Sequence, residues 1–534
     1  MPFRILVTDG IDPEGVALLA ADPQLDVDEV PTLPAVELLQ RIGEYDALVG
    51  RSATRITPEL LRAAKKIRVI GRAGVGVDNI AMDTATELGI SIINAPAGNT
   101  VAVAELVFGS LLSILRGLPF ADRTMHDGEW RRSELLGGEL KGRTLGIVGL
   151  GRIGSEAARR ALAFEMEVVA FDPYVPETRF QGLRVGRADS LAALLAVSDI
   201  VTIHTPLTDE TRGMIGKREL AKLKAGAILL NLARGGIVEE DALAEALRSG
   251  KLAGAALDVF GKEPLPADDP LRAIPNLFLT PHIGASTLEA QRNVARDVCE
   301  AVRETLLGGE LSRSINIASV EGVRWEELKP LLRLSERAAA VGRAILATQG
   351  NRAVQRVSVR AGAAHVGASE ALLSAAAVGV LEGVVECDRL NVINARTLAA
   401  QRGSELSAPE SAPGAADDIE IRISAGMQEV AVAGTASASA PARLTRIGAF
   451  HVDVQPRGTL LILTNEDVPG VIGRVGTVLG EAQINIAEYH QARLAQGGDA
   501  LAAVSVDGAV SEEVQAALLR IPGVRTATVV TFNR

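Results

Sequence analysis

Cysteine is nearly absent from this chain: only Cys299 and Cys387 occur among its 534 residues. Two isolated cysteines form neither the paired spacing of a metal site nor the disulfide framework of a small secreted domain. We therefore expect no bound metal. A reducing compartment, the cytoplasm, is the simplest expectation for so cysteine-poor a chain.

The chain also lacks an excess of positive charge and a long apolar run. Its 55 Lys and Arg are outnumbered by 66 Asp and Glu, which gives a net charge of -11. This balance argues against general nucleic-acid binding but permits a local basic patch for an anionic substrate. The apolar stretch 106–115 is too short to span a bilayer, and the N-terminal residues show no signal-peptide pattern. We expect neither a membrane nor a nucleic acid as a partner.

A chain of this length is too long for one hydrophobic core, so several domains are expected. Short apolar strands alternate with helical patterns in two series, which predicts parallel sheets covered by helices on both faces. The first series comprises Ile5–Thr8, Ala47–Gly50, Val69–Arg72 and Ser91–Asn94. The second comprises Thr144–Gly149, Val168–Asp172, Ile200–His204, Ala227–Leu232, Ala255–Val259 and Leu277–Thr280.

A long helix after the second series is expected to return to the first domain. The residues Ser286-Thr287-Leu288-Glu289 form a capping-box pattern, and the helix should end near Gly308-Gly309. The first domain would then be discontinuous. Beyond it, helical stretches near 330–347 and 369–386 mix with a β-like segment, Val354–Val359, and we predict loops at 403–417 and 436–441. Residues 459–534 have the strand and helix order of a ferredoxin-like fold.

The motif GLGRIG at residues 149–154 matches the dinucleotide fingerprint G-x-G-x-x-G. It follows a predicted strand and opens a helix, as that fingerprint requires. Gly149 would allow the tight turn, Gly151 the approach of a pyrophosphate, and Gly154 the close packing of helix on strand. The alternative is a glycine turn that binds nothing.

Asp172 ends the next predicted strand, where an acidic side chain would bind the ribose hydroxyls. A carboxylate there would repel a 2′-phosphate, so NAD is favoured over NADP. A similar glycine pattern at 71–76 has no acidic residue at the end of its next strand. We expect that loop to face the substrate, with a plain turn as the alternative.

Three side chains that suit a dehydrogenase follow strands of the dinucleotide domain. Of the six histidines, we take only His282 to sit just after such a strand; Arg234 and Glu263 lie in similar places. Ligands of open α/β sheets bind at these strand ends. Histidine can accept a hydroxyl proton near neutral pH, a carboxylate can orient the ring, and an arginine can bind a substrate carboxylate bidentately. Each residue taken alone could be an ordinary surface or loop residue.

These motifs resemble those of the D-2-hydroxyacid dehydrogenases. The matching stretches are GLGRIG, HTPL at 204–207, NLARGG at 231–236, DVF at 258–260 with the following KEP, and PHIGAST at 281–287. The chain is most similar to the long-form D-3-phosphoglycerate dehydrogenases, because RSAT at 51–54, GRAGVGVDN at 71–79 and GNT at 98–100 match their substrate loops. The additional domains match that form as well.

The resemblance implies a Rossmann-like NAD-binding domain (98–284) inserted in a flavodoxin-like substrate domain (1–97 and 285–317). An α+β intervening domain (318–455) and a ferredoxin-like ACT domain (456–534) would follow. The implied reaction is NAD-dependent oxidation of 3-phosphoglycerate, the first step of L-serine biosynthesis, by a homodimer or homotetramer. For the intervening domain, the resemblance suggests anion binding by Arg443, Arg446 and Arg457, although such a cluster is also typical of a solvated face.

The resemblance also implies roles for individual residues. Arg234, Glu263 and His282 would be catalytic, and Arg51, Arg72, Asn99 and Arg132 would bind the substrate, with Arg132 supplied by a neighbouring subunit. In the ACT domain, Asn465, Asp467 and Asn485 would bind an amino-acid effector, L-serine; a plain dimerisation domain is the alternative. The residues implied to contact NAD are Gly149, Gly151, Arg152, Ile153, Gly154, Asp172, Thr205, Pro206, Ala233, Asp258 and Gly284.

Two competing functions stay open at this point. The first is a dehydrogenase of the same family that acts on glyoxylate, hydroxypyruvate or another unphosphorylated hydroxy acid. The second is an NAD-sensing regulatory protein on the same fold. The extra arginines argue against the first, and the combination of Arg, Glu and His argues against the second.

Overall fold

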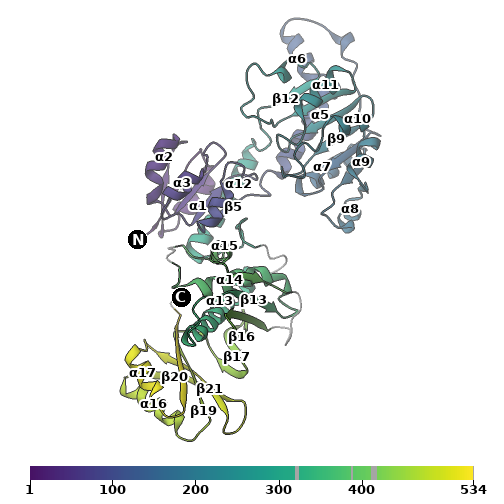
Figure 1. Cartoon of the computed structure of the whole chain (residues 1–534). Helices are drawn as coiled ribbons and strands as arrows, with labels where there is room; N and C mark the ends of the chain where they lie inside the picture. The colour runs from purple at the N-terminus through teal and green to yellow at the C-terminus, as the bar shows by residue number, and fades with distance from the viewer. Residues whose placement is uncertain (319–323, 386–388, 410–417, 533–534) are drawn as a thin grey trace.

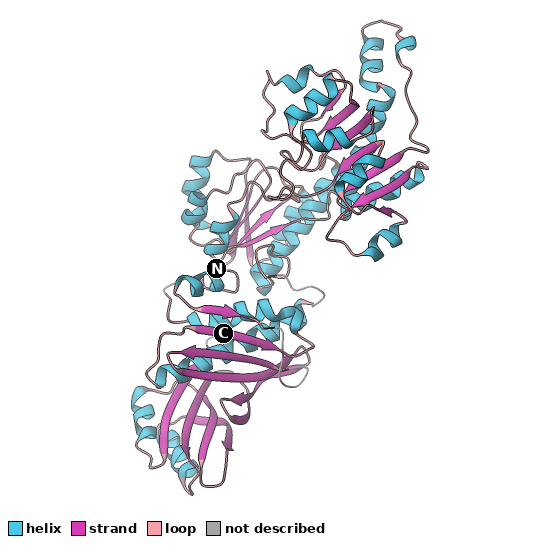
Figure 2. Cartoon of the chain, turned by 45° about the vertical axis from the view of Figure 1, so that its right-hand side comes forward, coloured by secondary structure: helices cyan, strands magenta, loops and turns pink. Residues whose placement is uncertain are grey.

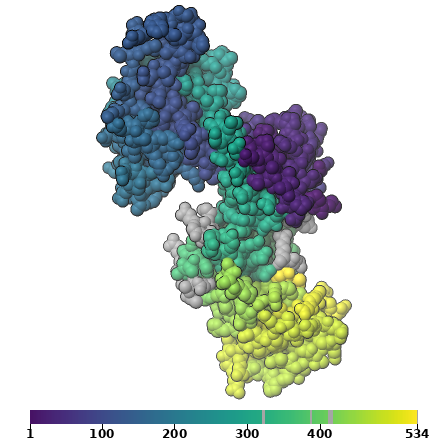
Figure 3. All heavy atoms as spheres, turned by 180° about the vertical axis from the view of Figure 1, so that it is seen from behind, coloured from purple at the N-terminus to yellow at the C-terminus, as the bar shows by residue number. Residues whose placement is uncertain are grey.

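We describe a computed structural model of the chain, in which residues 1–318, 324–385, 389–409 and 418–532 are placed. Cys387 lies outside these residues. The described residues form four sheets in an elongated molecule, in which the first sheet lies between the second and the third, and the fourth is at the opposite end from the second (Figure 1). Viewed from behind in Figure 3, the N-terminal lobe, the second domain and the C-terminal half are separate masses.

The first sheet has five parallel strands in the order β2-β1-β3-β4-β5. This is the flavodoxin-like order. Helices α1 (Pro13–Ala20) and α12 (Leu288–Gly308) cover one face, while α2 (Ala35–Arg41), α3 (Pro58–Ala63) and α4 (Met82–Glu87) cover the other. The strands are β1 (Phe3–Val7), β2 (Leu25–Glu29), β3 (Ala47–Gly50), β4 (Val69–Arg72) and β5 (Ser91–Asn94).

Helix α12 follows the loop after β12 and packs on this first sheet, as predicted. Its N-cap is Thr287, whose hydroxyl accepts from the backbone N–H of Ala290 at 3.1 Å, so the predicted capping box that begins at Ser286 is wrong by one residue. A Cβ on Gly15 of α1 would lie 2.7 Å from the backbone of Ala295, so α1 and α12 pack at close range.

The second sheet has seven parallel strands in the order β12-β11-β10-β9-β6-β7-β8. This is the Rossmann order with one additional strand. Helices α5 (Thr100–Arg116), α7 (Arg152–Ala163) and α8 (Glu177–Leu183) pack on one face; α9 (Leu191–Val197), α10 (Lys217–Lys222) and α11 (Glu240–Arg248) pack on the other. The strands are β6 (Thr144–Val148), β7 (Glu167–Phe171), β8 (Gly186–Arg187), β9 (Ile200–Ile203), β10 (Ala227–Asn231), β11 (Leu252–Leu257) and β12 (Leu277–Leu279).

The intervening domain packs a six-stranded, mostly antiparallel sheet on two helices, α13 (Trp325–Thr348) and α14 (Ser369–Leu381), and α15 (Ala395–Gln401) lies beside α14 (Figure 2). Its strands are β13 (Arg356–Ala361), β14 (Glu405–Ser407), β15 (Ile419–Ala425), β16 (Gln428–Ser437), β17 (Ala440–Ile447) and β18 (Phe450–Val454).

The loop predicted at 436–441 is wrong, because β16 and β17 pair through it as a tight hairpin, with Ser437 opposite Ala440. Burial of Ala436 and cross-strand pairing outweigh the weak strand preference of small residues. The loop predicted at 403–417 contains β14, and its residues 410–417 lie outside those described.

The C-terminal domain is an antiparallel sheet in the order β20-β21-β19-β22, with α16 (Val471–Glu481) and α17 (Glu512–Leu519) on one face. Its strands are β19 (Thr459–Glu466), β20 (Asn485–Arg493), β21 (Asp499–Asp507) and β22 (Val524–Thr531). This confirms the ferredoxin-like order. The other face of the sheet contributes Leu460, Ile462 and Val530 to the core of the intervening domain.

Within the described residues, no single helix has the length and apolar composition needed to cross a bilayer. Helices α5 and α6 (Leu118–His126) meet those criteria only as a pair, and the chain bends by 65° between them.

Candidate active site

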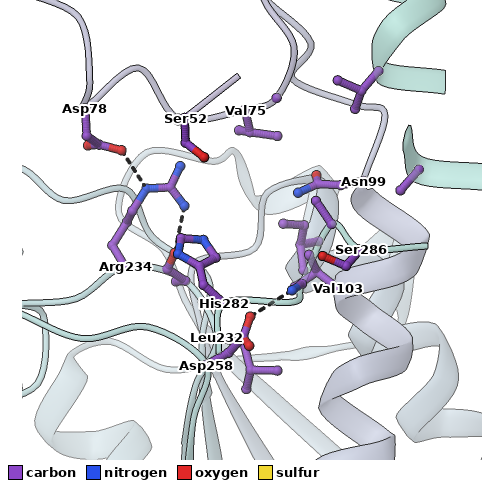
Figure 4. A pocket seen from close by; sticks show the side chains of 18 of the residues that line it. Ser52, Val75, Asp78, Asn99, Val103, Leu232, Arg234, Asp258, His282 and Ser286 are labelled. Atoms are coloured by element: carbon purple, nitrogen blue, oxygen red, sulfur yellow. Dashed lines mark hydrogen bonds and ion pairs between the residues drawn. The ribbon is translucent and has the colours of Figure 1, made fainter. Parts of the chain in front are cut away.

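A cavity of about 560 Å³ lies between the first and second sheets (Figure 4). The N-terminal domain lines it with the loops that follow β3, β4 and β5. The second domain lines it with the start of α7 and the loops that follow β9, β10, β11 and β12. The carboxyl ends of parallel strands from two sheets therefore face the same space, which is where open α/β sheets bind their ligands.

The three fingerprint glycines differ in what a side chain would meet. Gly149 has φ 93°, and a Cβ there would lie 2.7 Å from the carbonyl oxygen of His204. On Gly154 it would lie 2.1 Å from the carbonyl oxygen of Gly149, so α7 packs directly on the turn. On Gly151 it would meet nothing within 4 Å. The open space beside Gly151 fits a pyrophosphate at the N-terminus of α7.

Asp172 lies at the end of β7, beside this turn. Its carboxylate accepts from the backbone N–H of Leu150 at 2.8 Å and from that of Tyr174 at 2.9 Å. These two bonds fix the carboxylate next to the glycine turn and leave acceptor capacity for a ribose diol. Asp172 and the fingerprint therefore fit one end of a dinucleotide.

The loops after β9, β10, β11 and β12 contain further residues expected to contact the nucleotide. Thr205, Pro206, Ala233, Asp258 and Gly284 line the cavity, together with Arg152 and Ile153 of α7. The hydroxyl oxygen of Thr205 is buried and has no hydrogen-bond partner among the described residues. A polar atom of this kind is available to a ligand.

His282 and Glu263 form a hydrogen-bonded pair at the cavity. Nδ1 of His282 lies 2.7 Å from Oε2 of Glu263, and the other carboxylate oxygen accepts from the backbone N–H of Phe260 at 3.0 Å. The pair fixes the ring plane and leaves Nε2 for a substrate. Because an imidazole whose Nδ1–H is held by a carboxylate can accept a proton at Nε2, this arrangement suits a general base.

Asp258 holds the loop that bears His282. Its buried carboxylate accepts from the hydroxyl of Thr280 at 2.6 Å and from the backbone N–H groups of Ile283 at 2.7 Å and Gly284 at 2.8 Å. His282 itself has φ 53°, an uncommon backbone conformation for a residue other than glycine. The bonds to Asp258 hold the chain in this conformation on both sides of His282.

Arg234 reaches the same space from the loop after β10. Its Nε lies 3.2 Å from Oδ2 of Asp78, and its NH1 donates to the carbonyl oxygen of Ala233 at 2.7 Å. The side chain of Asn231 ties this loop together, since it donates to the carbonyl of Arg234 at 2.9 Å and accepts from the N–H of Ala233 at 3.2 Å.

Two further arginines, Arg51 and Arg72, line the cavity from the N-terminal domain. Burial lowers the pKa of Arg51, and burial together with the positive charges of Arg234 and Arg51 lowers the pKa of Arg72 to about 10. The amide oxygen of Asn99, beside them, is buried without a partner among the described residues. Burial and mutual repulsion disfavour the charged forms of these arginines, and a bound anion would stabilise them.

Asp9 holds the loop that bears Arg51, and sequence reasoning did not identify it. Its carboxylate accepts from the backbone N–H groups of Arg51 at 2.7 Å and Thr54 at 3.0 Å. Asp9 belongs to no recognisable sequence motif, because Arg51 and Thr54 lie more than forty residues further along the chain. The sequence indicates only that Asp9 follows the first strand.

The prediction that only His282 follows a strand of the second domain is wrong. His204 follows β9 directly and also lines the cavity. Its Nε2 lies 3.0 Å from the hydroxyl of Thr202, and burial lowers its pKa to about 4. At neutral pH this histidine is therefore uncharged and a weak base, which leaves His282 as the better proton acceptor.

The structure does not bring Arg132 to the cavity of its own chain. Arg132 is exposed in a short 3-10 turn, Arg132–Glu134, beyond helix α6. The three predicted effector residues also do not come together within one chain, because Asn485 lies far from Asn465 and Asp467. Asn465 pairs with Ala500 at one end of the C-terminal sheet, whereas Asn485 pairs with Asp507 at the other. At about 3.3 Å per residue, that separation is roughly 20 Å.

The fold and the site define a class: an NAD-dependent dehydrogenase of D-2-hydroxy acids. The family model for the D-isomer specific 2-hydroxyacid dehydrogenase NAD-binding domain matches residues 108–284, and the ACT-domain model matches residues 459–523. The chain is therefore an NAD-dependent oxidoreductase with a C-terminal ACT domain.

Curated relatives extend this likeness over the whole chain. D-3-phosphoglycerate dehydrogenase of Archaeoglobus fulgidus is 38% identical over 99% of this chain and 100% of its own length. Those of Bacillus subtilis and Mycobacterium tuberculosis are 38% and 37% identical, over 98% and 96% of both chains. The chain belongs to the D-3-phosphoglycerate dehydrogenase family.

Solved structures match part of this chain. The TT0316 protein of Thermus thermophilus is 38% identical and superposes with a TM-score of 0.55 over 59% of this chain and 100% of its own. A glyoxylate reductase from Paecilomyes thermophila, 33% identical, covers 59% of this chain and 99% of its own with a TM-score of 0.54.

Proposed function

We propose that this protein oxidises 3-phospho-D-glycerate to 3-phosphohydroxypyruvate with NAD, the first step of L-serine biosynthesis. The observation that carries the proposal is the convergence of Arg51, Arg72 and Arg234 beside the His282–Glu263 pair. A substrate with a carboxylate at one end and a phosphate at the other needs several cations around one reactive carbon.

The proposed chemistry follows from this geometry. The glycine turn, Asp172 and Thr205 would hold NAD, which would supply the acceptor for the hydride on C2 of the substrate. Nε2 of His282 takes the proton of the C2 hydroxyl, and Glu263 stabilises the resulting imidazolium through Nδ1. Arg234 binds the substrate carboxylate and so fixes C2 in front of His282.

The main alternative is a dehydrogenase for an unphosphorylated acid, and a substrate panel separates the two. In the NADH-consuming direction, we expect kcat/KM for 3-phosphohydroxypyruvate to exceed that for hydroxypyruvate or glyoxylate by at least about 100-fold, since two charged hydrogen bonds to phosphate are each worth about 1.5–3 kcal/mol. Equal values would favour the alternative. Absence of all turnover would favour an NAD-sensing regulatory protein.

Cofactor choice is proposed to depend on Asp172. The Asp172→Ala variant should narrow the preference for NAD over NADP, because it removes the charge that repels a 2′-phosphate and the acceptor for the ribose hydroxyls. The measurement is kcat/KM with each cofactor, and Asp189→Ala, which removes an exposed carboxylate of the same domain, is the control. A wild-type protein that used both cofactors equally would refute this role.

We propose that a second subunit completes the substrate site. Arg132 would reach the cavity of a second subunit, and the apolar side chains beside it, Trp130 at 78% exposure and Leu136 at 98%, would be covered in the dimer. We propose a homodimer or homotetramer in the cytoplasm, with domains at 1–97 plus 285–317, 98–284, 318–455 and 456–534.

L-Serine is proposed to bind between two ACT domains. Strand β20 is an edge of its sheet, so two copies can pair β20 to β20 in antiparallel register. That pairing would bring the partner subunit's Asn485 toward Asn465 and Asp467. Asp467 already accepts from the N–H of Gly497 at 3.2 Å and from Arg493 at 3.0 Å, and both hold its pKa below the usual range. It would present a charged oxygen to the ammonium of serine.

Calorimetric titration of L-serine tests this site. We expect L-serine to bind the wild type and to inhibit it. A coupling free energy of about 1–3 kcal/mol between the two sites corresponds to roughly a 5- to 150-fold change in affinity or activity. Asp467→Ala should abolish the binding, while Glu481→Ala, which removes an exposed carboxylate of α16, should retain it. Serine binding that survives Asp467→Ala would place the site elsewhere.

A further inference from the structure

The cavity contains a carboxylate that none of the roles above uses. Asp78 lies in the loop after β4, in the N-terminal domain, and its side chain extends to Arg234 in the second domain (Figure 4). The side chain is 66% exposed, yet it faces the arginine proposed to bind the substrate carboxylate. We propose that Asp78 is a positioning residue that orients Arg234 for substrate, an inference that rests on the proposed role of Arg234.

The contacts of Arg234 define which edge of the guanidinium is left for a ligand. Oδ2 of Asp78 lies 3.2 Å from Nε as an ion pair, and the carbonyl oxygen of Ala233 accepts a hydrogen bond from NH1 at 2.7 Å. The planar group is therefore held on two sides, by one ion pair and one hydrogen bond. The edge formed by NH1 and NH2 still has hydrogens to donate, and two parallel donors are what a carboxylate binds best.

Gly76 leaves room for this arrangement. A Cβ there would lie 2.1 Å from NH2 of Arg234 and 2.7 Å from Oδ2 of Asp78. The absence of a side chain at this position lets the ion pair cross the cavity from one domain to the other.

The neighbouring residue anchors Asp78. Asn79 donates through its side-chain amide to the carbonyl oxygens of Arg51 at 3.1 Å and Thr54 at 2.7 Å. Two consecutive residues therefore point to two parts of the site: Asp78 to the carboxylate-binding arginine, and Asn79 to the loop that bears Arg51. This explains how an exposed aspartate keeps a defined position.

Asp78 also counters a surplus of positive charge. Burial and then the positive charges of Arg234 and Arg51 lower the pKa of Arg72, while Asp78 and Asp9 oppose that shift. Without Asp78, repulsion would favour rotamers in which Arg234 swings away from the other two arginines. The carboxylate thus keeps three cations in one cavity before an anionic substrate arrives.

A carboxylate beside Arg234 could instead compete with the substrate, and the two roles predict opposite signs. If Asp78 competed with the substrate for Arg234, removing Asp78 would tighten substrate binding. A positioning residue strengthens binding, so its removal would weaken it. Asp78 occupies Nε and leaves the NH1–NH2 edge, which favours the second role.

The test measures the Kd of 3-phosphoglycerate from the enzyme–NADH complex by NADH fluorescence, which requires no turnover, together with KM and kcat. We expect Asp78→Ala to raise this Kd and KM about 10-fold and Asp78→Asn only about 3-fold, because the amide keeps a polar oxygen beside Nε but loses the negative charge. The Kd of NADH should be unchanged in both. Asp83→Ala, which removes an exposed carboxylate of α4, is the matched control.

A double-mutant cycle shows whether Asp78 acts through Arg234. In an Arg234→Ala background, Asp78→Ala should change the Kd of 3-phosphoglycerate by less than about 2-fold. An unchanged or lower Kd in the single variant, or an equal loss in the Arg234→Ala background, would overturn the proposal. If Arg234→Ala itself left this Kd unchanged, the proposed function of Arg234 would fail instead.

Discussion

Replacing His282 with asparagine is expected to lower kcat by at least about 10²-fold and to leave the Kd of NADH nearly unchanged. The substitution removes the proton acceptor but keeps a side chain of similar polarity. Asparagine has no basic nitrogen, so the C2 hydroxyl proton would have to pass to water. The nucleotide residues at the start of α7 and the end of β7 lie on other elements, so cofactor binding should persist.

Two further variants make the result specific for His282. Glu263→Gln should lower kcat by a smaller factor, because the ring loses its negatively charged partner, 2.7 Å away, but keeps its basic nitrogen. His451→Asn alters an exposed histidine of β18 and should have no effect on turnover. Near-normal turnover of His282→Asn would refute its assignment as the base.

Replacing Arg72 with alanine is expected to raise KM for 3-phosphoglycerate by roughly 10- to 100-fold, since loss of one charged hydrogen bond costs about 1.5–3 kcal/mol. Arg72 is the most confined of the cavity arginines: burial and two neighbouring cations lower its pKa to about 10, and its Nε is buried without a partner among the described residues. A phosphate would supply both the missing charge and the missing acceptor.

Arg51→Ala and Arg132→Ala should produce KM changes of the same size if all three bind the phosphate end. The Arg132 result carries additional information, because this residue can act only from a second subunit. Arg68→Ala, at the opposite end of β4, is the control and should leave KM unchanged. Unchanged KM in the Arg72, Arg51 and Arg132 variants would show that the phosphate lies elsewhere.

Much of the fold could be predicted from local patterns. The strands Ala47–Gly50, Val69–Arg72 and Ser91–Asn94 have the predicted bounds, because continuous apolar runs between turn residues are typical of buried parallel strands. The edge strand β2, Leu25–Glu29, was missed, since its alternating acidic residues resemble a loop. The hairpin at 436–441 was missed because tertiary packing, not residue type, determines it.

In the site, too, residues that lie in local motifs could be predicted, whereas residues defined by long-range contacts could not. Gly149, Asp172, Arg234 and His282 each lie in a recognisable motif next to a strand. Asp9 and Asp78 have no such motif, and their partners are separated from them by more than forty residues or lie in the other domain. The role of Asp9 becomes visible only when the first domain is folded, and that of Asp78 only when the two domains face each other.

We propose that this protein transfers a hydride from a phosphorylated D-2-hydroxy acid to NAD. The most direct measurement is the initial rate of NADH formation, followed by absorbance, with 3-phospho-D-glycerate or with D-glycerate as substrate. We expect NADH formation that requires both NAD and 3-phospho-D-glycerate. The kcat/KM for D-glycerate should be much lower. No NADH from 3-phospho-D-glycerate, or an equal kcat/KM for the two acids, would contradict it.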